Sequence, residues 1–193
     1  EAQALQTYLF STMRGVVGRY GYEEYHASIL EPAELYKAKG AENEELINEQ
    51  TYTFIDRGER EVTLRPEMTP TVARMVAAKR RELGFPLRLY CVPNFFRYER
   101  PQRGRLREFW QLNVDLFGAH SLAADAEVIG VAYGIMRALG GSESDFVIKL
   151  GSRPAINAIA ERAKLTPEAT NKFFALLDRR AKMPAAEFEA SLK

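Results

Sequence analysis

The stretch of residues 88–115 constrains the fold more than any other part of this chain. Apolar and aromatic segments flank a loop rich in arginine, with five arginines between positions 97 and 107 and a Pro-Gln-Arg-Gly turn near its middle. This pattern predicts two strands joined by a basic loop, with alternate side chains on opposite faces. Phe95, Arg97 and Glu99 would share one face. On the return strand, one face would carry Arg107, Phe109, Gln111, Asn113 and Asp115.

One surface of this ribbon would present cations, carboxylates, an aromatic ring and an amide. A guanidinium suits phosphate, a carboxylate suits an amine, and a ring suits a base, so the surface suits a nucleotide together with a small zwitterion. The alternative is a solvated hairpin whose charges form cross-strand ion pairs. The flanking apolar runs, the density of arginine and the Phe and Trp beside the charges favour the binding site.

Composition limits the class of protein. At 193 residues and 46% hydrophobic, the chain can form one domain with a core. The net charge of +1 does not indicate a nucleic-acid-binding protein, so RNA contact would come from a local patch such as residues 79–81 or the basic loop. The single cysteine, Cys91, excludes an internal disulfide, and His26 and His120 are not at metal-ligand spacing, so no metal site is predicted. Without a membrane-spanning run or signal pattern, a cytoplasmic protein is expected.

Periodicity predicts a central group of strands with helices on either side. Helical spacing of apolar residues predicts helices over residues 1–20, 70–83, 123–139 and 155–163, with Thr69 as the N-cap of the second. Runs rich in β-formers predict strands over residues 22–30, 51–56, 61–65 and 146–150, with a turn at Asp56-Arg57-Gly58 and a polar loop over 40–48. This order indicates an α+β fold with an antiparallel β-sheet rather than alternating βαβ units.

The end of the chain has a different character. Thr166-Pro167-Glu168 predicts the start of a helix that runs to about residue 182, and a last helical piece follows from residue 184. We therefore predict a domain over residues 1–163 and a helical C-terminal appendage over residues 164–193. Because the chain starts with Glu1 and enters helical periodicity at once, we expect it to be part of a longer gene product.

Three segments carry a resemblance to a known family. FRYERPQ (residues 96–102) and GRLREFWQLNVD (residues 104–115) resemble motif 2 of the class II aminoacyl-tRNA synthetases, and TLRPEMT (residues 63–69) narrows the resemblance to histidyl-tRNA synthetase. The resemblance runs from about residue 20 to about residue 153. It implies a class II synthetase-like antiparallel β-sheet flanked by helices, with a helical insertion beginning near residue 164. Residues 1–30 resemble motif 1, which implies a homodimer formed through the N-terminal helix and strand.

The resemblance also implies an activity. Members of this family join histidine to ATP, giving histidyl adenylate and pyrophosphate, and then transfer the histidyl group to tRNA(His). Arg97 matches the arginine that binds the α-phosphate and the substrate carboxylate, and Glu99 would accept the adenine amino group. Phe109 would stack on the base, and Arg105 is a candidate for the outer phosphates. Mg²⁺ would bridge phosphate oxygens, with no protein ligand indicated.

Four further residues would bind histidine. Glu67 and Thr69 match the residues that receive the α-ammonium group, and Gln111 lies beside the bound amino acid in the family. Asp115 occupies the position of a glutamate that accepts the imidazole N–H. The second arginine segment, motif 3 and the anticodon-binding domain are not found in the 193 residues, so we expect the chain alone to activate histidine poorly.

Three other functions remain as alternatives. The regulatory subunit of ATP phosphoribosyltransferase has the same fold and senses histidine without aminoacylation, but a pure sensor would not need the ATP residues. A prolyl or threonyl synthetase fits TLRPEMT and QLNVD less well. A general RNA-binding scaffold is disfavoured by the balanced charge.

Overall fold

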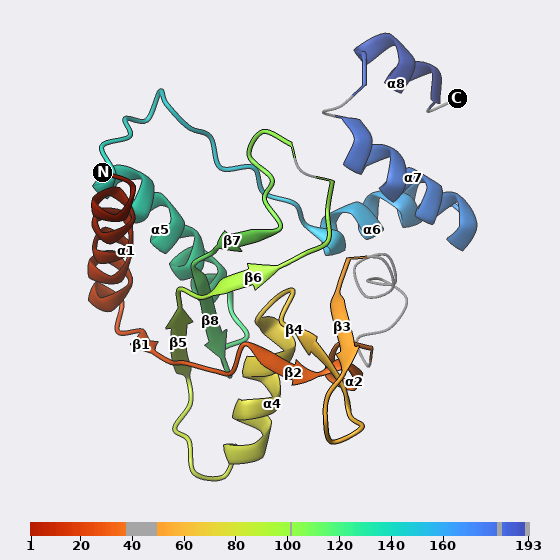
Figure 1. Ribbon diagram of the computed structural model, residues 1–193. Helices are drawn as coiled ribbons and strands as arrows, with labels where there is room; N and C mark the ends of the chain where they lie inside the picture. The colour runs from red at the N-terminus through yellow and green to blue at the C-terminus, as the bar shows by residue number, and fades with distance from the viewer. Residues whose placement is uncertain (38–49, 101, 181–182, 192–193) are drawn as a thin grey trace. The chain divides into compact units, whose positions relative to one another are not determined.

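The computed structural model describes residues 1–37, 50–100, 102–180 and 183–191 (Figure 1). These residues form two compact units, Glu1–Phe146 and Val147–Lys193. The domain boundary expected near residue 163 falls within the second unit and stays a prediction. The polar loop expected over residues 40–48 lies outside the described residues.

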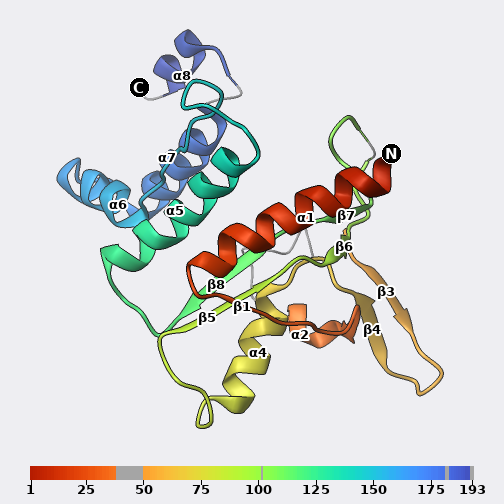
Figure 2. The same ribbon diagram turned by 90° about the vertical axis from the view of Figure 1, so that its left-hand side faces the viewer.

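A three-stranded sheet of order β1-β5-β8 forms the centre of the first unit. β5 (Leu87–Cys91) pairs in parallel with β1 (Glu23–Glu24) and antiparallel with β8 (Asn113–Phe117). Helices α1 (Ala2–Arg19) and α5 (Leu122–Ala138) lie on one face, and α4 (Thr69–Lys79) lies on the other, as Figure 2 shows.

Each face of this sheet has its own apolar cluster. On the α1 and α5 side, Val17 and Val131 pack with Tyr90 of β5. On the α4 side, Val72 packs with the next residue of β5, Cys91. The two-residue alternation of a strand therefore divides its side chains between two cores.

A second sheet has the order β2-β4-β3 and is fully antiparallel. It contains β2 (Leu30–Pro32), β3 (Tyr52–Ile55) and β4 (Glu61–Leu64), and the short helix α2 (Ala33–Lys37) follows β2 directly. The predicted turn between β3 and β4 is confirmed, because Asp56 Oδ1 accepts hydrogen bonds from the amides of Gly58 and Arg60 at 2.8 and 3.0 Å. The predicted fold class is confirmed, although the β1–β5 pair is parallel.

The ribbon of residues 88–115 is divided into two ladders rather than two continuous strands. β5 pairs with β8, and the ribbon continues as β6 (Asn94–Phe96) paired with β7 (Glu108–Trp110). Pro93 lies at the break after β5 and has no N–H to donate to a ladder. Its carbonyl instead accepts a hydrogen bond from the Gln111 amide at 3.1 Å, which holds the two sides of the break together.

Three local expectations were wrong. Residues 22–30 form no single strand, because β1 and β2 belong to different sheets. Residues 146–150 form no strand; Val147 and Leu150 are 80% and 73% exposed, and no strand in the described part of the chain pairs with them. Thr69 is the first residue of α4 rather than its N-cap, and the preceding Met68, fully buried, takes the cap position.

The described part of the second unit contains the helices α6 (Arg153–Arg162), α7 (Pro167–Arg179) and α8 (Ala185–Ser191). The helix start predicted at residues 166–168 is confirmed, because the Thr166 hydroxyl accepts a hydrogen bond from the Ala169 amide at 3.2 Å. None of the described helices combines the length and the apolar composition needed to cross a membrane.

Candidate active site

Arg97 and Phe109 form the centre of the candidate site. The guanidinium carbon of Arg97 lies 5.3 Å from the centre of the Phe109 ring, and the Phe95 ring is 5.8 Å from the same ring. The register of β6 and β7 explains this, since Phe95 is directly opposite Phe109. The ribbon therefore places a guanidinium and an aromatic ring on the same side, as the alternation of residues predicts.

The inner nitrogen of Arg97 is occupied by the backbone of another segment. Arg97 Nε donates to the carbonyl of Pro66 at 2.9 Å, and the Phe96 amide donates to the carbonyl of Arg65 at 3.1 Å. Within the described residues, the two terminal nitrogens of Arg97 make no hydrogen bond. The guanidinium is thus held in place while the nitrogens suited to an anion remain available.

A hollow of about 360 Å³ lies beside these two residues. It is lined by Arg97, Glu99, Gly104, Arg105, Leu106, Phe109 and Trp110. Arg105 Nη1 is 3.3 Å from Glu99 Oε2, and the Arg105 side chain is 63% exposed. An ion pair this exposed contributes about 0–1 kcal/mol, so a ligand could replace it at small cost. All four residues expected to bind ATP therefore border one hollow.

Glu67 and Thr69 lie at the start of α4. Glu67 is half-buried and Thr69 is exposed, on either side of the fully buried Met68. Thr69 is the first residue inside α4, and the cap position belongs to Met68, which makes no side-chain cap hydrogen bond. The Tyr36 hydroxyl donates to the backbone carbonyl of Glu67 at 3.3 Å.

Gln111 lies in the connection between β7 and β8, and Asp115 lies on β8. Gln111 is exposed, and its Nε2 donates to Asn113 Oδ1 at 2.8 Å. Asp115 is opposite Leu89 in the β5–β8 ladder, on the face that α4 covers. Its Oδ2 atom is buried and has no hydrogen-bond partner among the described residues, and burial raises the pKa of the carboxyl group. A buried acceptor in this state is suited to a ligand N–H.

The two segments that carry the residues expected to bind histidine meet in one apolar cluster through neighbouring side chains. Met68 of the Glu67 segment and Phe117 of β8 both pack in the cluster under α4, and Phe109 joins it from β7. The structure thus connects the start of α4 with the end of the ribbon, which the sequence separates by about forty residues.

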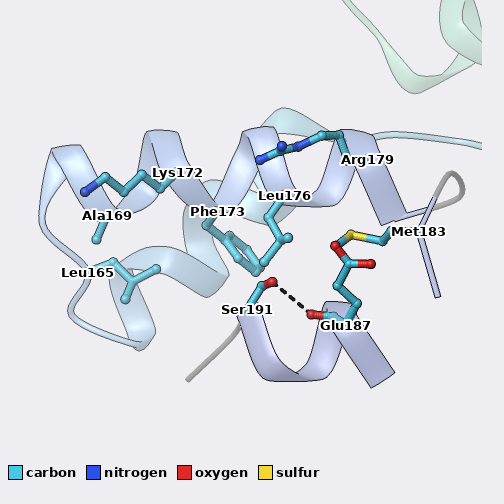
Figure 3. A pocket seen from close by; sticks show the side chains of 9 residues that line it. All are labelled: Leu165, Ala169, Lys172, Phe173, Leu176, Arg179, Met183, Glu187 and Ser191. Carbon is cyan, nitrogen blue, oxygen red and sulfur yellow. Dashed lines mark hydrogen bonds between the residues drawn. The ribbon is translucent and has the colours of Figure 1, made fainter. Parts of the chain in front are cut away.

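The second unit contains a separate hollow of about 620 Å³ beside α7 and α8 (Figure 3). Phe173, Leu176 and Met183 supply its apolar side chains, and Lys172, Arg179 and Glu187 supply charges. None of the residues predicted to bind ATP or histidine lines it. The chemistry indicated by the sequence therefore belongs to the first unit.

Comparison with known proteins decides the family. The family described as histidyl-tRNA synthetase matches residues 1–193, the whole chain. The chain belongs to the histidyl-tRNA synthetase family. The resemblance carried by FRYERPQ, GRLREFWQLNVD and TLRPEMT is therefore confirmed.

Related proteins agree with this assignment. A histidine–tRNA ligase of Leptospira biflexa is 44% identical over 98% of this chain and 43% of its own length. A histidine–tRNA ligase of Haloarcula marismortui is 40% identical over 97% of this chain and 42% of its own length. This member of the histidyl-tRNA synthetase family thus spans about 43% of the length of the curated relatives that it matches.

Solved structures share the fold. Histidyl-tRNA synthetase from a Nostoc species has a TM-score of 0.78 at 24% identity, covering 98% of this chain and 42% of that chain. A Bacillus halodurans structure described as an ATP phosphoribosyltransferase regulatory subunit/histidyl-tRNA synthetase has a TM-score of 0.76 at 25% identity, covering 90% of this chain and 43% of that chain.

Arg65 is a residue that pattern-based reasoning missed in this synthetase family member. It is 5% exposed, and its guanidinium donates to the carbonyls of Asn94 and Ala27 at 2.9 and 3.0 Å and to Asn94 Oδ1 at 2.9 Å. It therefore joins the end of β4 to β6 and to the connection between β1 and β2. Its place inside TLRPEMT was a signal, but an arginine after a strand is usually an exposed residue.

Proposed function

We propose that this chain supplies the ATP- and histidine-binding half of a histidine–tRNA ligase. The observation that carries the proposal is Arg97, which is anchored by Pro66, lies over Phe109 and borders the hollow that Glu99 and Arg105 also line. Membership in the histidyl-tRNA synthetase family supports the same activity.

In the first step, an oxygen of the histidine carboxylate attacks the α-phosphorus of ATP. A new P–O bond forms to histidine while the bond to the β-phosphate bridging oxygen breaks, and pyrophosphate leaves with that electron pair. Arg97 would bind both anions, so their mutual repulsion would fall and the attacking oxygen would lie in line. Most of the rate would come from placement and electrostatics, because no proton needs to move at the reacting atoms.

ATP would bind along the ribbon. Phe109 would stack against adenine, Glu99 would accept the adenine amino group, and Arg105 would reach the outer phosphates. The Glu99–Arg105 pair would separate when ATP enters. Glu99 would then face the adenine amino group, and Arg105 would face the phosphates. Mg²⁺ would be carried on the phosphate oxygens. The described residues contain no group of three or more His, Cys, Asp or Glu side chains that could hold it.

Histidine would bind between α4 and β8. Glu67 would pair with the α-ammonium group, Thr69 would add its hydroxyl, and Gln111 would lie beside the amino acid. The buried Oδ2 of Asp115 would accept an imidazole N–H. An amino acid without that N–H would leave the acceptor unpaired, so this contact would discriminate strongly.

Transfer of the histidyl group to tRNA(His) would complete the reaction. A homodimer formed through α1 and β1, and a cytoplasmic location, are further parts of this proposal. Because the chain spans about 43% of the length of its curated relatives, we expect its own exchange of pyrophosphate into ATP to be much slower than that of a complete synthetase. Histidine-dependent exchange at the rate of a complete enzyme would contradict this expectation.

Calorimetric titration of the chain with ATP and with histidine, separately, tests the proposal. Binding of both ligands is the expected result, and binding of neither would overturn it. A second candidate function, a histidine sensor, is favoured by the likeness to the Bacillus halodurans structure with its regulatory-subunit description. Histidine binding without ATP binding would select the sensor. The ATP residues retained around the hollow favour the ligase.

A further inference from the structure

A chain of polar contacts runs from the surface of α4 to the backbone of Glu67. Arg74 Nη2 donates to Glu31 Oε1 at 2.7 Å, and the Thr71 hydroxyl donates to the same oxygen at 3.1 Å. The Tyr36 hydroxyl is 3.3 Å from Thr71 Oγ1 and donates to the Glu67 carbonyl at 3.3 Å. Helix α2, strand β2 and helix α4 each contribute to this chain.

The three middle members of the chain are almost completely buried. Glu31 is 3% exposed, Thr71 is fully buried and Tyr36 is 2% exposed. Water therefore has little access to replace a lost partner, and each hydrogen bond matters more than it would on the surface.

The Glu31 carboxylate sets the direction of the hydrogen bonds. A carboxylate only accepts, so Thr71 gives Glu31 its one O–H and can only accept from Tyr36. The single hydrogen of Tyr36 then lies between the Thr71 oxygen and the Glu67 carbonyl. The phenol is thereby fixed as a donor, with its one hydrogen shared between the Thr71 oxygen and the Glu67 carbonyl.

We infer that Tyr36 is a positioning residue for the histidine α-ammonium group. This inference rests on the proposed role of Glu67 in binding that group. Tyr36 does not touch the substrate; it holds the Glu67 carbonyl, while Arg97 holds the preceding carbonyl of Pro66. Two side chains from separate elements thus fix the backbone that carries the Glu67 carboxylate. A preset carboxylate binds an ammonium group without a further ordering cost.

Tyr36→Phe tests this inference, because it removes one hydroxyl and keeps the ring that fills the core. A net hydrogen bond of this kind corresponds to about a three- to tenfold change, so we expect histidine to bind about three- to tenfold more weakly and ATP to bind unchanged. Tyr90→Phe is the matched control. Tyr90 is also buried, and its hydroxyl donates to Glu24 Oε2 at 3.2 Å, on the sheet face that α1 covers. The control should leave both affinities unchanged.

A second ligand separates positioning from general packing. Imidazole propionate is histidine without its ammonium group, so Tyr36→Phe and the unchanged chain should bind it equally, as measured by competition calorimetry. An equal loss for histidine and imidazole propionate would overturn the inference, as would unchanged histidine affinity. Loss of cooperative thermal unfolding in Tyr36→Phe but not in Tyr90→Phe would also overturn it. If the unchanged chain binds no histidine, the proposed function itself fails, which is a distinguishable result.

Discussion

Arg97 and Pro66, which are 31 positions apart in the chain, are joined by a hydrogen bond of 2.9 Å from Nε to the backbone carbonyl. This bond links the ribbon of residues 88–115 to the segment TLRPEMT. Only arginine can donate through an inner nitrogen and still present two outer nitrogens to an anion. The two sequence segments that identify the family are thus one structural unit.

Arg97→Lys should weaken ATP binding by about ten- to hundredfold, because hydrogen bonds to charged groups contribute about 1.5–3 kcal/mol. Lysine loses both the bond to Pro66 and the planar fork. Calorimetric titration with ATP measures the effect. Arg100→Lys, a change at an exposed neighbour, serves as the control and should bind ATP with nearly normal affinity. Nearly normal affinity in Arg97→Lys would show that only the charge of the loop matters, and an equal loss in both variants would contradict the special role of Arg97.

Arg105→Ala should weaken ATP binding while leaving the stability of the folded chain nearly unchanged. The Glu99–Arg105 pair is exposed, so its loss should change the free energy of unfolding by less than about 1 kcal/mol. ATP affinity should nevertheless fall, and the fall should be smaller for AMP, which lacks the outer phosphates. Urea denaturation and calorimetry with both nucleotides provide the comparison. The same loss for ATP and AMP would place Arg105 elsewhere than at the outer phosphates.

Asp115→Asn should stabilise the folded chain at neutral pH and weaken histidine binding. Burial raises the pKa of the Asp115 carboxyl group, so the folded state holds this proton more tightly than the unfolded state. Stability therefore falls as pH rises from the unfolded pKa through the folded pKa. Removing the unpartnered buried charge should add about 1 kcal/mol at pH 7, or about 2–4 °C in Tm.

Thermal unfolding between pH 4 and pH 8 tests this prediction. Asp56→Asn is a control of opposite sign, because hydrogen bonds from Arg60 lower the pKa of the Asp56 carboxyl group. The Asp56 carboxylate therefore stabilises the folded chain at neutral pH, and this effect is lost only below the pH range of the experiment, so Asp56→Asn should lower the Tm at pH 7. A lower Tm for Asp115→Asn at pH 7 would mean that the Asp115 carboxylate is satisfied in solution.

Arg65→Met should destabilise the first unit by more than about 2 kcal/mol, because it leaves several part-buried carbonyl oxygens without their donors. Those carbonyls belong to Ala27, Ser28 and Asn94. The free energy of unfolding in urea measures the effect. Arg57→Met, at the exposed turn after β3, is the control. A change of the same small size in both variants would contradict the role of Arg65 in joining these segments.

Cys91 should be unreactive toward thiol reagents in the folded chain. The side chain is 2% exposed, and burial raises the pKa of its thiol to about 11. Below that pH, the reactive thiolate is a small fraction, and reagents have little access to it. The reaction with an aromatic disulfide reagent, followed by absorbance, should show no fast phase at pH 8. After unfolding in urea, one equivalent of thiol per chain should react. Fast modification without urea would show that β5 opens readily.

Several features followed from the sequence alone because they depend on neighbouring residues. The turn at residues 56–58, the helix start at Thr166 and the two faces of each strand are set by local hydrogen bonding and by the two-residue period. The common side of Arg97 and Phe109 followed from the same period once their strands were paired.

Other features depended on contacts between distant segments. The burial of Arg65, the Tyr36 contact with Glu67 and the isolated Oδ2 of Asp115 arise where segments far apart in the sequence pack together. The failed strand over residues 146–150 and the cap position of Met68 have the same origin, since a strand needs a partner and a buried side chain needs a core. The local sequence pattern indicates which residues could form a site. How those residues are held depends on desolvation and on long-range hydrogen bonds, and these exist only in the folded chain.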